Sequence, residues 1–215
     1  MLNTLDDSIT LVVAGAWNPD ILSPNWVAKE ALALQLDQNF PVNVQLPIGN
    51  PTQRPIFEFA NIRYLAAKGA LTLFLKPSEV VQINTSISAV TKILDLLSHT
   101  PITGFGFNFA YEIEDPSVAL LKTFSSGEIL TPLLADDTAQ VVAQMWKSLI
   151  KTQDRLLDLQ AELLGGKVRL DFNVHFEIPS ALGASQKLKT ENLFSDIKNT
   201  VSGIAQHLHD LGEQT

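Results

Sequence analysis

The residues best placed for chemistry alternate along one predicted strand late in the chain. Over residues 167–178 every second side chain is polar, so Asp171, Asn173, His175 and Glu177 share one face, because successive strand side chains point to opposite faces. An imidazole beside carboxylates could bind a metal ion or transfer protons. No spaced ligand motif accompanies this face. The sequence therefore favours a solvated strand face, with His175 as a candidate ligand-binding residue.

A second candidate is the loop Trp17-Asn18-Pro19-Asp20, which follows an apolar run and precedes a predicted helix start. Folds of the α/β type often place ligands at such loops. Trp17 offers a flat apolar wall, while Asn18 and Asp20 offer polar groups. Asn, Pro and Asp also build ordinary turns, and no partner residues complete a site. The sequence favours a turn with Trp17 in the core, and the three residues are candidates for ligand binding.

The other histidines and glycines do not form a recognisable site. His207 and His209 lie two residues apart on a predicted helix, where their directions differ by about 200° and prevent joint chelation. Gly104-Phe105-Gly106 lacks the third glycine and the following helix of a dinucleotide loop. Walker, nucleophile-elbow and zinc-protease motifs are absent from the sequence. We predict no catalytic residue, metal or cofactor, and whether the protein is an enzyme stays open.

The predicted strand of His175 belongs to a hairpin. Apolar and polar residues alternate over 154–164 and again over 167–178, with Gly165-Gly166 between the two arms. Glycine takes the positive φ that a tight hairpin turn requires. One face of each arm is apolar and must be buried. The sequence therefore predicts two antiparallel strands joined at Gly165-Gly166.

Short apolar runs between turn residues predict further strands. The expected strands cover residues 9–16, 42–48, 56–66, 70–75 and 102–113. A second hairpin is expected to turn at Lys68-Gly69. In the last strand, Gly104 and Gly106 leave room for a close neighbour on one face.

Helices are predicted from cap residues and from apolar stripes with a period near 3.6. The expected helices cover approximately residues 24–37, 79–97, 116–124, 138–151 and 186–211. Ser23 and Ser78 are the expected N-caps of the first two. A strand is the alternative for 138–151, but Gln144 and Lys147 would then sit among apolar neighbours, so a helix is preferred. Residues 125–137 and 179–184 are expected to form a surface loop and a linker.

The composition limits the function classes. Of 215 residues, 46% are apolar and 18% are charged, with a net charge of −8, which supports a folded core. Nucleic acid and anionic membranes are not expected as partners, because lysine and arginine are not clustered. The absence of cysteine excludes disulfides and thiolate chemistry. The polar start of the chain lacks a basic signal region, and the longest apolar run is short, so a soluble cytoplasmic protein is expected.

The order of predicted elements repeats along the chain. Strand, helix, strand, strand, helix occurs over residues 9–98 and again over 102–211, and the matching helices would carry Trp26 and Trp146. A Pro-Ser pair also follows each hairpin, at Pro77-Ser78 and Pro179-Ser180. Chance similarity is equally well supported, because the hairpin arms differ in length and Pro-Ser often separates a strand from a following helix. The expected fold is α+β, with antiparallel-rich mixed sheets covered by helices. Its halves, residues 1–100 and 101–215, are expected to pack as one pseudo-symmetric domain.

The first hypothesis for function is a non-enzymatic module for protein–protein interaction or assembly, because no nucleophile, base and oxyanion donor converge. A homodimer through the final helix or a sheet edge is expected, since the apolar stripe of that helix spans its length. The alternative is a small-molecule-binding protein or enzyme with a pocket between the two halves. Such a pocket would lie near Trp17, Asn18, Asp20 and His175. An exposed apolar patch would favour the first hypothesis, and convergent polar groups the second.

Overall fold

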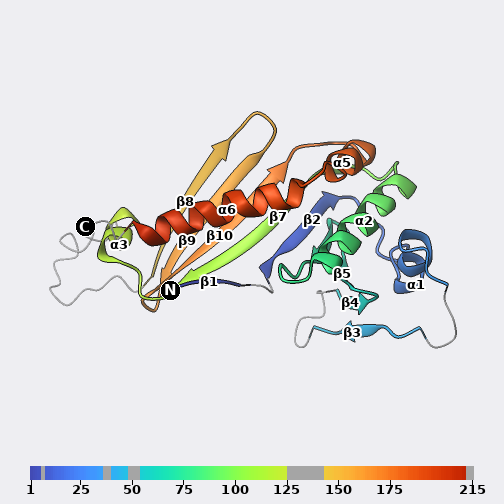
Figure 1. The fold of residues 1–215 in the computed structure, drawn as a ribbon. Coiled ribbons are helices and arrows are strands. Elements are labelled where there is room, and N and C mark those ends of the chain that lie inside the picture. The colour runs from blue at the N-terminus through green and yellow to red at the C-terminus, as the bar shows by residue number, and fades with distance from the viewer. Residues whose placement is uncertain (6–7, 36–39, 48–53, 125–142, 212–215) are drawn as a thin grey trace. The chain divides into compact units, whose positions relative to one another are not determined.

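The structure is a computed structural model. It describes residues 1–5, 8–35, 40–47, 54–124 and 143–211. These residues group into two compact units, each built from several segments of the chain. Unit 1 comprises Met1–Leu5, Phe109–Val174 and Phe194–Thr215, and unit 2 comprises Asp6–Asn108 and His175–Leu193. Both units contain strands and helices (Figure 1), which confirms the predicted α+β class.

Unit 2 contains an antiparallel sheet in the strand order β3-β4-β5-β6-β2-β7. Its strands are β2 (Thr10–Gly15), β3 (Asn43–Gln45), β4 (Ile56–Phe59), β5 (Ile62–Ala66), β6 (Ala70–Phe74) and the first part of β7 (Ile102–Ile113). β2 pairs with β6 on one side and with β7 on the other. Leu11 and Val13 of β2 are fully buried. The predicted strands over residues 9–16 and 102–113 are confirmed, and β3 is a shortened form of the one predicted over 42–48.

The single strand predicted over residues 56–66 is wrong, because the chain turns back in its middle. β4 and β5 pair as a hairpin around Ala60 and Asn61. Both turn residues have positive φ, 45° and 61°, as primed hairpin turns require. Asparagine is enriched in this conformation, so Asn61 is a sequence signal for the turn between β4 and β5. Ala60 gives no such signal. The next hairpin, from β5 to β6, turns at Lys68-Gly69 as predicted.

The first helix of unit 2 begins as predicted but ends early. Ser23 caps α1 (Pro24–Trp26), and its hydroxyl accepts from the Trp26 amide. The chain continues as the π-helix η2 (Val27–Ala31). The predicted end near Asp37 is wrong, since Ala33 has a φ of 53°, and a left-handed residue ends a helix.

Ser78 is not the N-cap of α2 (Val80–Leu96). Glu79 occupies that position, and its side chain makes no capping hydrogen bond. Gln82 instead connects the first turn of α2 to the end of β6. Its Nε2 donates to the Phe74 carbonyl at 2.8 Å, and its Oε1 accepts from the Lys76 amide at 3.1 Å. A buried glutamine therefore fixes the start of α2 where a serine cap was predicted.

The linker predicted over 179–184 and the single final helix predicted over 186–211 are wrong. α5 (Ala181–Leu188) begins inside the expected linker, and the Ser180 hydroxyl caps it by accepting from the Gly183 amide. A separate helix, α6 (Leu193–Asp210), follows. Asn192, with a φ of 61°, lies between them, and a left-handed residue interrupts helical hydrogen bonding. The apolar stripe alone did not reveal this break.

Asp95 connects α2 to α5 in unit 2. The buried Ser185 hydroxyl donates to Asp95 Oδ1 at 2.6 Å, and Lys189 Nζ donates to Oδ2 at 2.8 Å. The hydrogen bond from Lys189 has the larger effect and that from Ser185 the smaller, and together they hold the pKa of Asp95 below its ordinary value of 3.8. The carboxylate therefore stabilises the helix pair only in its charged form.

We expect Asp95→Asn to lower the free energy of unfolding by about 1 kcal/mol at pH 7, a modest effect because the pair is partly solvated. A carboxyl whose pKa is lower in the folded state contributes above its unfolded pKa, and the contribution disappears as the pH falls through the folded value. Urea unfolding should therefore show a difference from wild type that shrinks below about pH 4. Glu191→Gln, at an exposed carboxylate of the same unit, is the control. A difference unchanged at acid pH would contradict this assignment.

Unit 1 contains β1 (Leu2–Thr4), the rest of β7, β8 (Ala143–Lys151), β9 (Leu156–Leu164) and β10 (Lys167–Phe176) up to Val174, in the order β1-β7-β10-β9-β8. The predicted hairpin is confirmed, because Gly165 and Gly166 join β9 to β10 with φ values of 60° and 81°. The short helix α3 (Val118–Phe124) is also confirmed. The loop expected over 125–137 lies outside the described residues.

Helix α6 crosses the strands of unit 1 in Figure 1. Its buried side chains are Phe194, Ile197, Val201 and Ala205. Phe194 stacks on Phe109 of β7 with ring centroids 6.0 Å apart, and Ser202 Oγ lies 2.9 Å from the Tyr111 hydroxyl. The helix therefore covers the apolar face of the strands that the sequence predicted to need burial. None of the helices that the structure describes combines the length and apolar character of a membrane span.

The helix predicted over residues 138–151 is wrong. Ala143–Lys151 form strand β8, and residues 138–142 lie outside the described part. The strand was rejected because Gln144 and Lys147 would sit among apolar neighbours. β8 is the last strand in the order and most of its residues are exposed. Polar and apolar residues can therefore share either face of this strand. The predicted duplication needs a helix here and is not confirmed, and the division at residue 100 stays a prediction.

Candidate functional site

Trp17 lies in the core of unit 2, with only 4% of its surface exposed. Its indole Nε1 donates to the Val13 carbonyl at 2.9 Å. Asn18 and Asp20 are exposed, and Asn18 Oδ1 accepts from the Asp20 amide at 3.1 Å, the usual contact of an Asx turn. The structure brings Asn18 and Asp20 together and directs Trp17 into the core, and ligand binding by these three residues stays a prediction.

His175, the fourth candidate, packs against the backbone of β7. A Cβ placed on Gly104 would lie 2.9 Å from Cε1 and 3.1 Å from Nε2 of the His175 ring. The close neighbour predicted beside Gly104 is therefore His175 with the adjoining Phe176 carbonyl. Asp171, which shares the alternating pattern, forms an ion pair with Arg169 at 2.8 Å. Among the described residues, no group of three histidine, aspartate or glutamate side chains could hold a metal ion.

His209 at the end of α6 contacts its own helix. His209 Nδ1 lies 2.8 Å from Asp210 Oδ1, and this hydrogen bond lowers the pKa of Asp210. Gln206 Nε2 also donates to that carboxylate at 2.7 Å.

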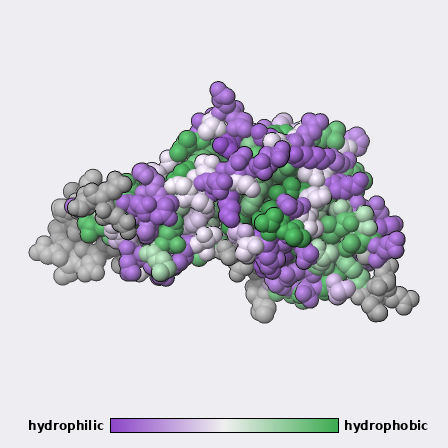
Figure 2. Space-filling model, viewed as in Figure 1, coloured by the Kyte–Doolittle hydropathy of each residue, from purple (hydrophilic) through white to green (hydrophobic). Residues whose placement is uncertain are grey.

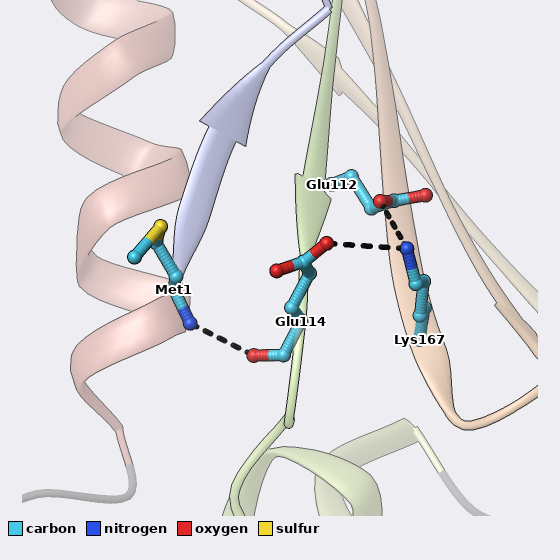
Figure 3. A network of polar contacts seen from close by, with 4 residues as sticks. All are labelled: Met1, Glu112, Glu114 and Lys167. Carbon is cyan, nitrogen blue, oxygen red and sulfur yellow. Dashed lines mark hydrogen bonds and ion pairs between the residues drawn. The ribbon is translucent and has the colours of Figure 1, made fainter.

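Lys167 forms a surface network at the start of β10 (Figure 3). Its Nζ lies 2.8 Å from Glu112 Oε1 and 3.2 Å from Glu114 Oε1. The hydrogen bond to Glu112, followed by that to Glu114, raises the pKa of the lysine. The Glu114 carbonyl accepts from the Met1 amino group at 2.9 Å. This network links β1, β7 and β10 at one end of unit 1.

A pocket of about 260 Å³ lies in unit 2 between the β4–β5 turn and the start of α2. Charged residues of both signs line it, namely Glu58, Arg63, Lys76 and Glu79. The Arg63 guanidinium lies 4.8 Å from the centroid of the Phe74 ring, and Lys76 Nζ lies 3.5 Å from Glu79. The pocket could hold a small polar molecule. Sequence reasoning missed it because its lining comes from segments that only the sheet brings together.

The exposed strand β8 is the second feature that the sequence did not reveal. Four of its large apolar side chains are exposed, with fractions of 59%, 38%, 59% and 47% for Met145, Trp146, Leu149 and Ile150. Figure 2 shows hydrophilic surface at the tip of the β8–β9 hairpin and hydrophobic patches among more polar surface below it. Exposed apolar side chains that gather on a surface can mark an interaction site.

The two faces of β8 differ in their neighbours. Trp146 and Ile150 lie opposite Ala161 and Leu157 of β9, both of which are buried, so they extend the core face of unit 1. Trp146 also lies 5.3 Å from the Phe124 ring of α3, between centroids.

On the other face, Met145 and Leu149 lie opposite Glu162 and Asp158. Lys147, between them, forms an ion pair with Asp158 at 2.7 Å. The core face of unit 1 therefore ends in exposed apolar side chains, and its polar face carries two more.

Comparisons with known proteins identify no relative: no family model, curated protein or solved structure matches this chain. The pocket beside α2 and the exposed strand β8 are therefore the two features from which a function can be proposed.

Proposed function

We propose that this protein is an interaction module that binds another polypeptide through the outer edge of β8. The observation that carries the proposal is a nine-residue strand at the end of the sheet order with four exposed large apolar side chains. In the part of the chain that the structure describes, only β9 pairs with β8. An extended partner can add a strand to such an edge, where main-chain hydrogen bonds supply affinity and alternate side chains supply specificity.

The composition of β8 supports this proposal. Natural edge strands are usually protected by being short, by proline, by a bulge or by charged side chains. β8 has no proline, its register against β9 is continuous over nine residue pairs, and its only charges are Lys147 and Lys151. Lys147 is engaged by Asp158. The outer edge of β8 thus has few of the features that protect an unpaired strand edge from binding another strand.

The test is a double substitution on the polar face, Met145→Lys with Leu149→Lys. Both residues are exposed, so the variant should keep its fold, while added lysines block edge pairing. Val81→Lys with Leu182→Lys, at two exposed apolar residues of unit 2, is the matched control.

Tagged wild type and both variants are used to capture partners from the source-cell lysate, followed by native mass spectrometry. We expect the edge variant to lose bound polypeptide, including added copies of the chain, by at least about tenfold, equivalent to roughly 1.4 kcal/mol. The control should retain it. Equal recovery with the edge variant, or recovery of the wild type alone and monomeric, would refute the proposed function.

A further inference from the structure

We infer that the polypeptide bound by β8 is a second copy of this chain, paired antiparallel to it across a two-fold axis at Ser148. This inference depends on the proposed function. A two-fold interface presents the same surface twice, so the strand must be complementary to itself.

The outward backbone groups follow from the register of the β8–β9 hairpin. The Thr152 amide donates to the Arg155 carbonyl at 2.9 Å, and the pairing continues from Lys151 opposite Leu156 without a shift. Hydrogen-bonded and non-hydrogen-bonded pairs alternate along an antiparallel ladder. The backbone groups that face away from β9 are therefore those of Met145, Lys147, Leu149 and Lys151.

Only some two-fold registers suit these residues. An axis at Lys147 places this lysine opposite its own copy, and an axis at Leu149 places Lys147 opposite Lys151 of the second copy. Like charges directly opposite one another destabilise a sheet. An axis at Ser148 avoids both and pairs every residue from Met145 to Lys151. An axis at Trp146 would leave Ile150 without a partner among the described residues of the second copy.

The Ser148 register also places favourable pairs on both faces. Trp146 lies opposite Ile150 of the second copy, twice by symmetry, and aromatic residues pair well with β-branched ones across strands. These are non-hydrogen-bonded pairs, whose side chains approach most closely. Lys147 lies opposite Leu149 of the second copy, so the lysine stem covers exposed apolar surface.

Charge complementarity favours a second copy over an unrelated strand. In the Ser148 register, Lys151 of the second copy lies opposite Met145, which in turn lies opposite Glu162 of β9. Lysine and glutamate would then be two strand spacings, about 10 Å, apart on the same face, within reach of the two extended side chains. The chain carries a net charge of −8, yet residues 143–151 contain only lysines as charged residues. The two lysines of the edge would thus lie on the same face of the sheet as Asp158 and Glu162 of the adjoining strand.

The absence of cysteine from the sequence makes a cross-linking test direct. Residues opposite each other in a non-hydrogen-bonded pair have Cα atoms about 4.5 Å apart, within the range that a disulfide spans. Ser148→Cys should therefore give a covalent dimer on mild oxidation. Lys147→Cys and Leu149→Cys report the two neighbouring registers, and Lys151→Cys, about 20 Å from its own copy in the proposed register, reports random collision.

We expect the dimeric fraction on non-reducing gels to be at least about fivefold higher for Ser148→Cys than for the other three variants. Cross-linking that is greatest at residue 147 or 149, or equal at all four, would overturn the register. Native mass spectrometry of the cysteine-free protein at micromolar concentration should show a dimer. Met145→Lys with Leu149→Lys should raise its dissociation constant at least tenfold, and Val81→Lys with Leu182→Lys should leave it unchanged.

One outcome separates this inference from the proposed function. A monomeric wild type that still captures a different protein in an edge-dependent manner overturns the second copy but not the interaction module. A dimer that persists in the edge variant places the contact elsewhere and overturns both. A monomer that captures nothing also overturns both.

Discussion

Gly104→Ala is expected to lower the free energy of unfolding by about 3 kcal/mol, at the upper end of the usual cost of overpacking. A Cβ at this position would overlap the Phe176 carbonyl oxygen and meet the His175 ring. The backbone oxygen cannot rotate away as a flexible side chain can. The neighbouring Phe105 and Phe176 rings, buried and stacked with centroids 4.9 Å apart, hold the two strands at this separation, so relief requires a shift of the backbone.

The matched control is Gly69→Ala in the β5–β6 turn. A Cβ there meets no atom within 4 Å and its φ is not positive. Its stability should therefore stay the same or rise by up to about 1 kcal/mol, since alanine restricts the unfolded chain. Urea unfolding of both variants measures the difference. Equal stabilities would show that β7 and β10 are further apart at this point than the structure has them.

A double substitution separates the two neighbours of Gly104. If the His175 ring caused most of the strain, adding His175→Ala would restore the stability of Gly104→Ala. We expect only partial recovery, because the Phe176 carbonyl remains in place. The coupling between the two substitutions gives the share of the strain that belongs to the ring. It also assigns His175 a packing role that its place in an alternating polar pattern did not predict.

The sequence predicted those elements in which large apolar residues recur at every second position. β7 from Phe105 to Ile113 and the β9–β10 hairpin follow this pattern, and Gly165-Gly166 supplied the positive φ values that join the hairpin. The helix α1 was predicted from the Ser23 cap. In each case the residue type itself carries the conformational preference, so local reasoning was sufficient.

Local reasoning failed where one residue in an otherwise uniform pattern changes the chain direction. Asn61 and Asn192, both at a φ of 61°, turn a predicted strand into a hairpin and a predicted helix into two. Asparagine tolerates this conformation without demanding it, so its presence alone does not predict a turn. The choice depends on which alternative buries more apolar surface, which the surrounding segments decide.

The candidate interaction surface could not be predicted for a related reason. Met145, Trp146, Leu149 and Ile150 also fit the apolar face of a helix, and an amphipathic helix is the usual interpretation of that spacing. They are exposed because β8 ends the strand order, and this order depends on long-range pairing. By contrast, the turn formers beside Trp17 favoured a turn with the tryptophan in the core, and Trp17 is buried next to the turn that Asn18 and Asp20 form.

Trp17→Ala is expected to lower the free energy of unfolding by about 4 kcal/mol, the typical cost of removing a large buried aromatic side chain. The indole is 4% exposed and donates to the Val13 carbonyl. Trp17→Phe keeps most of the volume and loses the hydrogen bond, so it should cost about 1–2 kcal/mol. Asn18→Ala, which removes only the exposed turn contact, should cost less than about 1 kcal/mol.

These three variants distinguish a core residue from the wall of a binding site. A core tryptophan produces a graded loss of stability from phenylalanine to alanine, because the cavity grows with each step. A tryptophan kept for a ligand would be dispensable for folding, and its removal would then change stability by no more than the Asn18 control. Chemical unfolding followed by circular dichroism measures all three without depending on tryptophan fluorescence. A loss below about 1 kcal/mol for Trp17→Ala would favour ligand binding by the loop of Trp17, Asn18 and Asp20. Substitutions of surface residues rarely lower the free energy of unfolding by more than this.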